Sequence, residues 1–143
     1  MPITARTIQQ TADRGSFERM VRSHFDSPRA EVRISAGAED GANTRRITLE
    51  VIDRLKAPWK GRWRVFVYLA GAIDGAPDAT GNTVALVAGT TALQTVLANA
   101  VYHLLTGTNG QAQFDLTVPA GAQTRAVCAD VDGQVKQEAF AWT

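Results

Sequence analysis

Apolar and polar residues alternate with a period of two along most of the chain from about residue 30 onward. The alternation is cleanest in residues 45–51, where Ile47, Leu49 and Val51 fall on one face. In residues 62–69 one face carries Trp63, Val65, Val67 and Leu69, and the other carries Arg62, Arg64, Phe66 and Tyr68. A period of two is that of a half-buried strand, so both runs predict strands.

Shorter runs predict further strands at residues 31–34, 83–88, 112–118, 123–131 and 134–142, with Asp132-Gly133 as a hairpin turn. Residues 90–105 fit two structures. Their apolar positions match a helical stripe, whereas their Thr and Val content and the turn that follows favour two strands, at 91–97 and 100–106. Because Asn109-Gly110 stands between apolar runs, we expect a hairpin between the second of these strands and 112–118.

About eight or nine short strands separated by turn residues predict an all-β fold, an antiparallel β-sandwich with an immunoglobulin-like strand pattern. Strands and helices do not alternate along the chain, so nothing predicts a parallel sheet with a nucleotide site. We expect this sandwich to occupy residues 30–143 and to follow an N-terminal arm of residues 1–29, which lacks the alternation.

The arm contains one segment with helical spacing. Ser16 is a suitable N-cap and Pro28 a stop, which predicts a short amphipathic helix at residues 16–25. A helix of ten residues is not stable alone in water, so its apolar face docks either on its own domain or on a partner. The candidate partner-binding residues of the arm are Phe17, Met20, Val21, Arg22, Phe25 and Arg29.

Composition narrows the classes of partner. The chain has 143 residues and a formal net charge of +1, which gives no general attraction to nucleic acid or to an acidic membrane. Arg far outnumbers Lys among its 15 basic residues, and Arg suits ion pairs at protein interfaces. Cys128 is the single cysteine, so no internal disulfide forms. No apolar stretch is long enough to span a membrane, and the first ten residues lack the apolar core of a secretion signal, so we expect synthesis in a cytoplasm.

Candidate catalytic and metal-binding groups do not form any known constellation. His24 and His103 are far apart in sequence, the four serines lack a nucleophile motif, and no glycine-rich phosphate loop opens a helix. The loop at residues 74–82 has acidic residues, but not the density or the late Glu of a dedicated Ca²⁺ site. We therefore expect a protein that is not an enzyme and that has no cofactor and no metal.

Two segments remain candidates for contact with a partner. Residues 54–64 hold five basic residues and no acid, interleaved with Trp59 and Trp63. This composition fits a solvated turn with one buried Trp, a protein interface anchored by Trp59, Arg62 and Arg64, or single-stranded nucleic acid. At the other end of the chain, Trp142 next to the last residue indicates a terminus that is held either in the sheet or against a neighbour.

Two turn motifs carry a resemblance to a family. Residues 47–53, followed by Ala57-Pro58-Trp59-Lys60-Gly61 and a strand, resemble the opening of bacterial immunoglobulin-like domains, with Arg54-Leu55-Lys56 in place of the first turn glycine. Residues 104–114 resemble the "L-T-D-A-N-G-x-A" hairpin of the same domains, with Gly107 in place of Asp. Together the motifs cover residues 45–118, about half of the chain.

The resemblance implies a structural role. A single domain of this kind with an N-terminal arm is similar to structural proteins of tailed bacteriophages, above all to capsid decoration (cement) proteins. That implies a homotrimer on the virion surface, assembled in the bacterial host cytoplasm, which binds the major capsid protein or another virion protein and stabilises the shell. The alternatives are a phage tail or fibre component, a bacterial adhesin-like module, and a single-stranded nucleic-acid binder that uses residues 54–64.

Overall fold

The structure is a computed structural model, and it describes residues 30–143. The predicted helix at 16–25 and the six candidate residues of the arm lie outside the described residues. The described part forms nine strands and no helix: β1 (Glu31–Ala36), β2 (Thr44–Ile52), β3 (Arg64–Ala70), β4 (Thr83–Leu86), β5 (Thr91–Leu97), β6 (Val101–Leu105), β7 (Gln111–Thr117), β8 (Gln123–Val131) and β9 (Gln134–Trp142).

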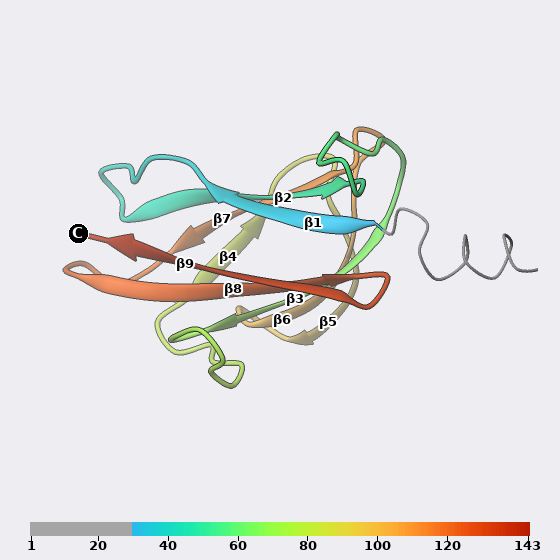
Figure 1. Ribbon diagram of the computed structural model, residues 1–143. Helices are drawn as coiled ribbons and strands as arrows, with labels where there is room; N and C mark the ends of the chain where they lie inside the picture. Colours follow the sequence, from blue (N-terminus) through green and yellow to red (C-terminus); the bar gives the residue numbers. More distant parts are fainter. Residues whose placement is uncertain (1–29) are drawn as a thin grey trace, which may run out of the picture.

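The strands form two antiparallel sheets that pack face to face (Figure 1). One sheet has four strands in the order β1-β2-β7-β4, and the other has five in the order β5-β6-β3-β8-β9. Edge strand β1 packs beside β9 and β8, so β4 and β5 are the edges on the opposite side of the sandwich. The predicted all-β antiparallel sandwich is confirmed.

The core lies between the two sheets and comes from the residues that alternate inward. The inward positions predicted on β2, Ile47, Leu49 and Val51, are all completely buried. They pack in one cluster with the inward residues of the other strands, such as Val65, Val67, Leu104, Phe114, Leu116, Val127 and Trp142. Because successive strand residues point to opposite faces, this cluster fixes which side chains of every strand point outward.

Residues 90–105 form two strands, as predicted, and not a helix. β5 and β6 pair with each other, and Asn99 in the loop between them has φ 64°, a left-handed conformation that asparagine tolerates better than most residues. The Asp132-Gly133 hairpin is confirmed too, since both residues have positive φ and Val131 pairs with Gln134 across the turn.

The hairpin predicted at 107–110 is wrong. A turn is present there, but β6 belongs to the five-stranded sheet and β7 to the four-stranded sheet, so the segment crosses between the layers. Its backbone groups bind the end of β2 and the β2–β3 loop instead: the Val51 N–H donates to the Gly110 carbonyl at 2.9 Å, and the Gly61 N–H donates to the Thr108 carbonyl at 2.8 Å. Residues 107–110 do form a turn, as their sequence predicts. The strand that follows the turn joins the other sheet, and these nonlocal contacts hold the turn in that position.

A polar network closes one end of the sandwich. The side-chain amide of Asn82, which is buried, donates to the carbonyl of Asn99 at 3.2 Å, and its oxygen accepts from the Arg125 guanidinium at 2.7 Å. The Asn99 side chain accepts from the Val84 N–H, and the Asn99 N–H donates to the Tyr102 hydroxyl. These bonds tie β8 and β4 to the β5–β6 loop, so they connect the two sheets.

Gly110→Ala and Gly133→Ala are both expected to lower the free energy of unfolding. The loss for Gly110→Ala should exceed that for Gly133→Ala by more than about 2 kcal/mol. The two glycines have nearly equal φ, 78° and 77°, so both substitutions strain the backbone alike. At Gly110 an added Cβ would also lie 2.4 Å from the Trp59 carbonyl oxygen, whereas at Gly133 it would meet nothing within 4 Å. Urea unfolding measures both variants, and equal losses would contradict the close approach at Gly110.

Candidate functional site: the outer face of the five-stranded sheet

The outward face of the four-stranded sheet is covered by polar side chains that bind one another. Arg46 forms two hydrogen bonds to the Asp115 carboxylate, at 2.8 and 3.1 Å. The Gln113 side chain donates to the Thr48 hydroxyl at 3.0 Å, and beside it Glu50 binds Arg33. This is the ordinary outer face of an antiparallel sheet, apolar toward the core and polar toward water.

The outward face of the five-stranded sheet has a different character. One row across it, from β5 to β9, is Gln94, His103, Phe66, Asp130 and Val135, and the next row is Leu97, Val101, Tyr68, Cys128 and Gln137. We refer to these two rows as the aromatic face. Asp130 is the single formally charged residue among the ten, and Phe66 packs against His103 with ring centroids 4.8 Å apart and ring planes tilted by 54°. Val135 is 60% exposed at the β9 end of its row.

The aromatic face continues into an exposed apolar edge at β5. All seven residues of β5 are exposed, among them Leu93 (46%), Val96 (55%) and Leu97 (47%). Exposed apolar residues that occur singly are common on any protein, but a continuous patch marks a contact site. Face and edge together are therefore the candidate contact surface of this domain.

The basic segment at residues 54–64 reaches this surface at one point. Arg64 begins β3 on the outward side, two residues before Phe66 and paired with Leu105 of β6. Arg62 is exposed in the preceding loop, and Trp59 packs edge-on against Trp63 with ring centroids 5.0 Å apart. Trp63 is partly buried against the core, which fits the interpretation of this segment as a solvated turn with one buried Trp. Of the predicted contact residues, Arg64 thus lies beside the aromatic face, and Trp59 and Arg62 lie in the adjoining loop.

Trp142 is held in the sheet and is not available to a partner. Its side chain is 1% exposed on the inner face of β9, and the Arg45 guanidinium covers the ring at 5.7 Å from its centroid. Beyond it, the backbone and hydroxyl of Thr143 both donate to Glu39 at 2.9 Å. Trp142 is therefore corrected from a partner contact to a core residue that anchors the C-terminal strand.

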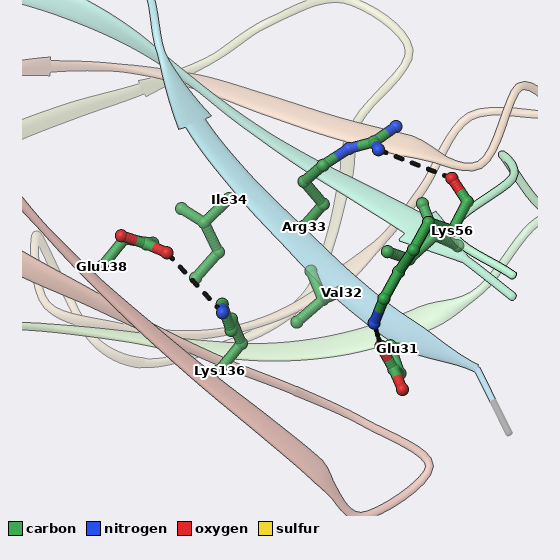
Figure 2. Close-up of a pocket in the computed structure, with 8 residues that line it drawn as sticks. Glu31, Val32, Arg33, Ile34, Lys56, Lys136 and Glu138 are labelled. Atoms are coloured by element: carbon green, nitrogen blue, oxygen red, sulfur yellow. Dashed lines mark hydrogen bonds and ion pairs between the residues drawn. The ribbon is translucent and has the colours of Figure 1, made fainter. Parts of the chain in front are cut away.

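A groove of 360 Å³ runs along the opposite side of the sandwich, between β1 and β9. Figure 2 shows its apolar floor, Val32 and Ile34, with charged side chains around it. Those charges are already paired: Lys56 with Glu31, Arg33 with Glu50, and Lys136 with Glu138 at 3.7 Å. The groove therefore offers no unpaired ionic group to a charged ligand.

Chemically reactive groups are scarce in the part of the chain that the structure describes. Within residues 30–143 no group of three or more His, Cys, Asp or Glu side chains could hold a metal ion, and no helix is long and apolar enough to cross a membrane. Cys128 is buried. The neighbouring Cys128 thiol, together with burial, raises the pKa of Tyr68 above its ordinary value.

Sequence reasoning placed Phe66 and Tyr68 on the outward face of their strand but did not assign them to a site. His103, Leu93 and Val96 were not assigned either. One signal could have found the β5 and β6 part of this surface, because no Asp, Glu, Lys or Arg occurs between Asp78 and Asp115. The contact of Phe66 with His103 depends on the register of β3 and β6, which are far apart in the chain, so sequence pattern does not give it.

No protein-family model and no curated protein matches the chain. Solved structures that resemble it include a β-glucuronidase of Parabacteroides merdae, with 13% identity and a TM-score of 0.43 over 79% of this chain. A conjugative transposon lipoprotein of Bacteroides eggerthii has 15% identity and a TM-score of 0.44, with 81% of this chain and 96% of that one covered. A conjugate transposon protein of Bacteroides vulgatus has 17% identity and a TM-score of 0.44, with 79% and 82% covered.

The chain spans 12% of the length of the glucuronidase. Likenesses this distant transfer neither an activity nor a partner to this protein.

Glu50→Gln is expected to lower stability at neutral pH and to have progressively less effect in acid. The Arg33 hydrogen bond, and then that from Gln111, hold the pKa of Glu50 below its ordinary value of 4.5. The ionised carboxylate therefore stabilises the fold above that value, and the contribution is lost as pH falls through the lower pKa of the folded state. Urea unfolding of both proteins at pH 7, 5, 4 and 3 tests this. A difference that stays constant down to pH 3 would contradict it.

Proposed function

We propose that this protein is a non-catalytic binding module that docks on a larger protein assembly through its aromatic face. The observation that carries the proposal is the contrast between the two outer faces. On one sheet the outward residues are mostly polar and hydrogen-bonded to each other. On the other they are mostly apolar or aromatic, with Phe66 and Tyr68 partly exposed and Val135 and Leu97 exposed. Burial of aromatic side chains such as Phe66 and Tyr68 is a main source of binding energy at protein interfaces.

We further propose that the sandwich is of the immunoglobulin-like type. Support comes from the pairing of β1 with β2, β2 with β7, β3 with β8 and β8 with β9, and from the division into four and five strands. This matches the spatial order of a variable-type domain, whose second sheet has five strands. The chain departs from that type in its connections, because β4 comes before β5 and β6 in sequence although it lies in the other sheet.

The assembly we propose is a bacteriophage virion, with the chain as a head decoration protein on the capsid surface. The support is the sequence resemblance of two turn segments within residues 45–118 to bacterial immunoglobulin-like domains, together with the use of such domains in phage structural proteins. A tail or fibre component of the same particle is the alternative. A protein that binds the assembled shell and not its free subunits stabilises the shell by mass action, with no catalytic chemistry.

Quantitative mass spectrometry of purified phage particles tests whether the chain is part of the virion. We expect the chain at a simple fraction of the number of major capsid subunits, because decoration follows the symmetry of the shell. A handful of copies per particle would favour the tail or fibre, and absence from the particles would overturn the virion proposal.

Charges placed on the aromatic face are expected to abolish binding to those particles. In His103→Glu with Val135→Glu, two exposed positions of the face acquire carboxylates that must lose water on docking, which costs several kcal/mol when they are unpaired. Ser35→Glu with Thr83→Glu is the matched control, because it adds the same charge at exposed positions on the outer face of the other sheet. Co-sedimentation of the labelled full chain with particles measures the binding.

Equal binding by the two double variants would exclude the aromatic face as the contact. If the chain instead binds a single-stranded oligonucleotide, with affinity that falls steeply as salt rises, the surface is a nucleic-acid interface that uses Arg64 beside Phe66.

A further inference from the structure

A long run of the sequence in the described part of the chain has no charged residue. None of the 29 charged residues lies between Asp78 and Asp115. That run contains all of β4, β5 and β6, and β4 and β5 are the two edge strands on one side of the sandwich. Neither edge strand on that side of the sandwich therefore carries a charged side chain.

The edge strands on the opposite side of the sandwich, β1 and β9, do carry charged side chains. Strand β1 carries Glu31 and Arg33, which pair with Lys56 and Glu50, and β9 carries Lys136 and Glu138. Charged side chains on an edge strand are a common protection against association with another molecule, because pairing would bury them. Strand β5, with the sequence Thr-Ala-Leu-Gln-Thr-Val-Leu, has no charge and no proline.

The form of β5 does not favour backbone pairing with a further strand. The pairing of β5 with β6 shifts register twice, and Leu93 and Val96 are the extra residues at the two shifts. Such bulges interrupt the row of backbone groups that another strand would bind, and they redirect side chains. Here they leave two large apolar side chains exposed in the middle of an uncharged edge.

We propose that the occupant of this edge is a second copy of the same chain, with the two β5 strands packed against each other across a two-fold axis, in place of the homotrimer that the sequence resemblance implies. An isologous contact brings the same patch of both copies together, so a patch with no charge has no like-charge repulsion with itself. The formal net charge of +1 leaves almost no long-range repulsion between copies. A partner with a charged surface would instead have to bury charges against Leu93 and Val96 without a counter-ion.

With its two-fold axis perpendicular to the sheets, the dimer would place the two five-stranded sheets edge to edge, with their aromatic faces on the same side. This consequence rests on the proposed function, since it gives the module two docking faces for a repetitive surface. Two linked contacts bind such a surface far more tightly than one, without any new interaction. The dimer itself does not depend on that function and is measured on the isolated protein.

Sedimentation velocity of the full chain, over concentrations of about 1 to 100 µM, is the first test. We expect a reversible monomer–dimer equilibrium. Leu93→Lys with Val96→Lys is expected to weaken dimerisation more than about tenfold, because four ammonium groups would meet at the axis. Leu55→Lys with Ile73→Lys is the matched control, because it adds the same charge at two exposed apolar residues in loops away from β5 and should leave the dimer intact.

A second variant with the opposite charge distinguishes loss of the dimer contact from misfolding of the Lys variant. Leu93→Glu with Val96→Glu should be monomeric alone but should form a heterodimer when mixed with the Lys variant, because opposite charges then face each other. A wild-type chain that is monomeric throughout the range, or trimeric, would overturn the proposal, as would a dimer that the Lys variant retains. If the wild-type chain dimerises yet does not bind particles, the proposed function fails while the dimer stands.

Discussion

The burial of two apolar sheet faces against each other is the interaction on which the rest of this structure depends. Each large side chain buried there, such as Leu49 or Phe114, contributes about 1.5–3 kcal/mol relative to exposure. Because the side-chain period of a strand is two, a residue chosen for the core also decides that its neighbours point outward. Burying Val65 and Val67 therefore forces Phe66 outward, and burying Leu104 forces His103 outward. The register that builds the core is the same register that brings Phe66 and His103 into contact.

The ends of the sandwich are closed by polar contacts. Where strands leave one sheet for the other, backbone groups lose their ladder partners and must be satisfied in another way. Asn82 and Asn99 do this at one end, and the buried Thr106 does it next to the β2–β3 loop, where its hydroxyl accepts from the Trp63 N–H and lies 3.0 Å from the Gly61 carbonyl. Gly110 fits there only because it has no side chain. The loop that carries Trp59 and the basic residues is therefore held rigidly beside the start of β3.

The sequence pattern predicts the strands because alternation is a local signal. It does not predict which sheet a strand joins or which side chains meet, because these depend on distant parts of the chain. The inward residues of β2 and the β8–β9 hairpin could be predicted, since a few neighbouring residues determine them. Whether the strand after Gly110 continues in the same sheet could not, because Asn109-Gly110 specifies a turn and not the sheet that the next strand joins. The role of Trp142 was left open between core and contact for the same reason, since its burial depends on Arg45 and on the opposite sheet. The exposure of Phe66 could be predicted from alternation, but its neighbours could not.

The two outer faces show what this fold needs and what it does not need. The four-stranded sheet demonstrates that this chain can cover an outward face with pairs such as Arg46–Asp115 and Thr48–Gln113. Similar residues at positions 66 and 103 would leave the inner core unchanged, so the stability of the sandwich does not require an aromatic face. Nor does it require Leu93 and Val96 at an exposed edge, where polar residues would protect against association. An apolar surface that the core does not need exposes the protein to aggregation, and a contact that covers the surface removes that hazard.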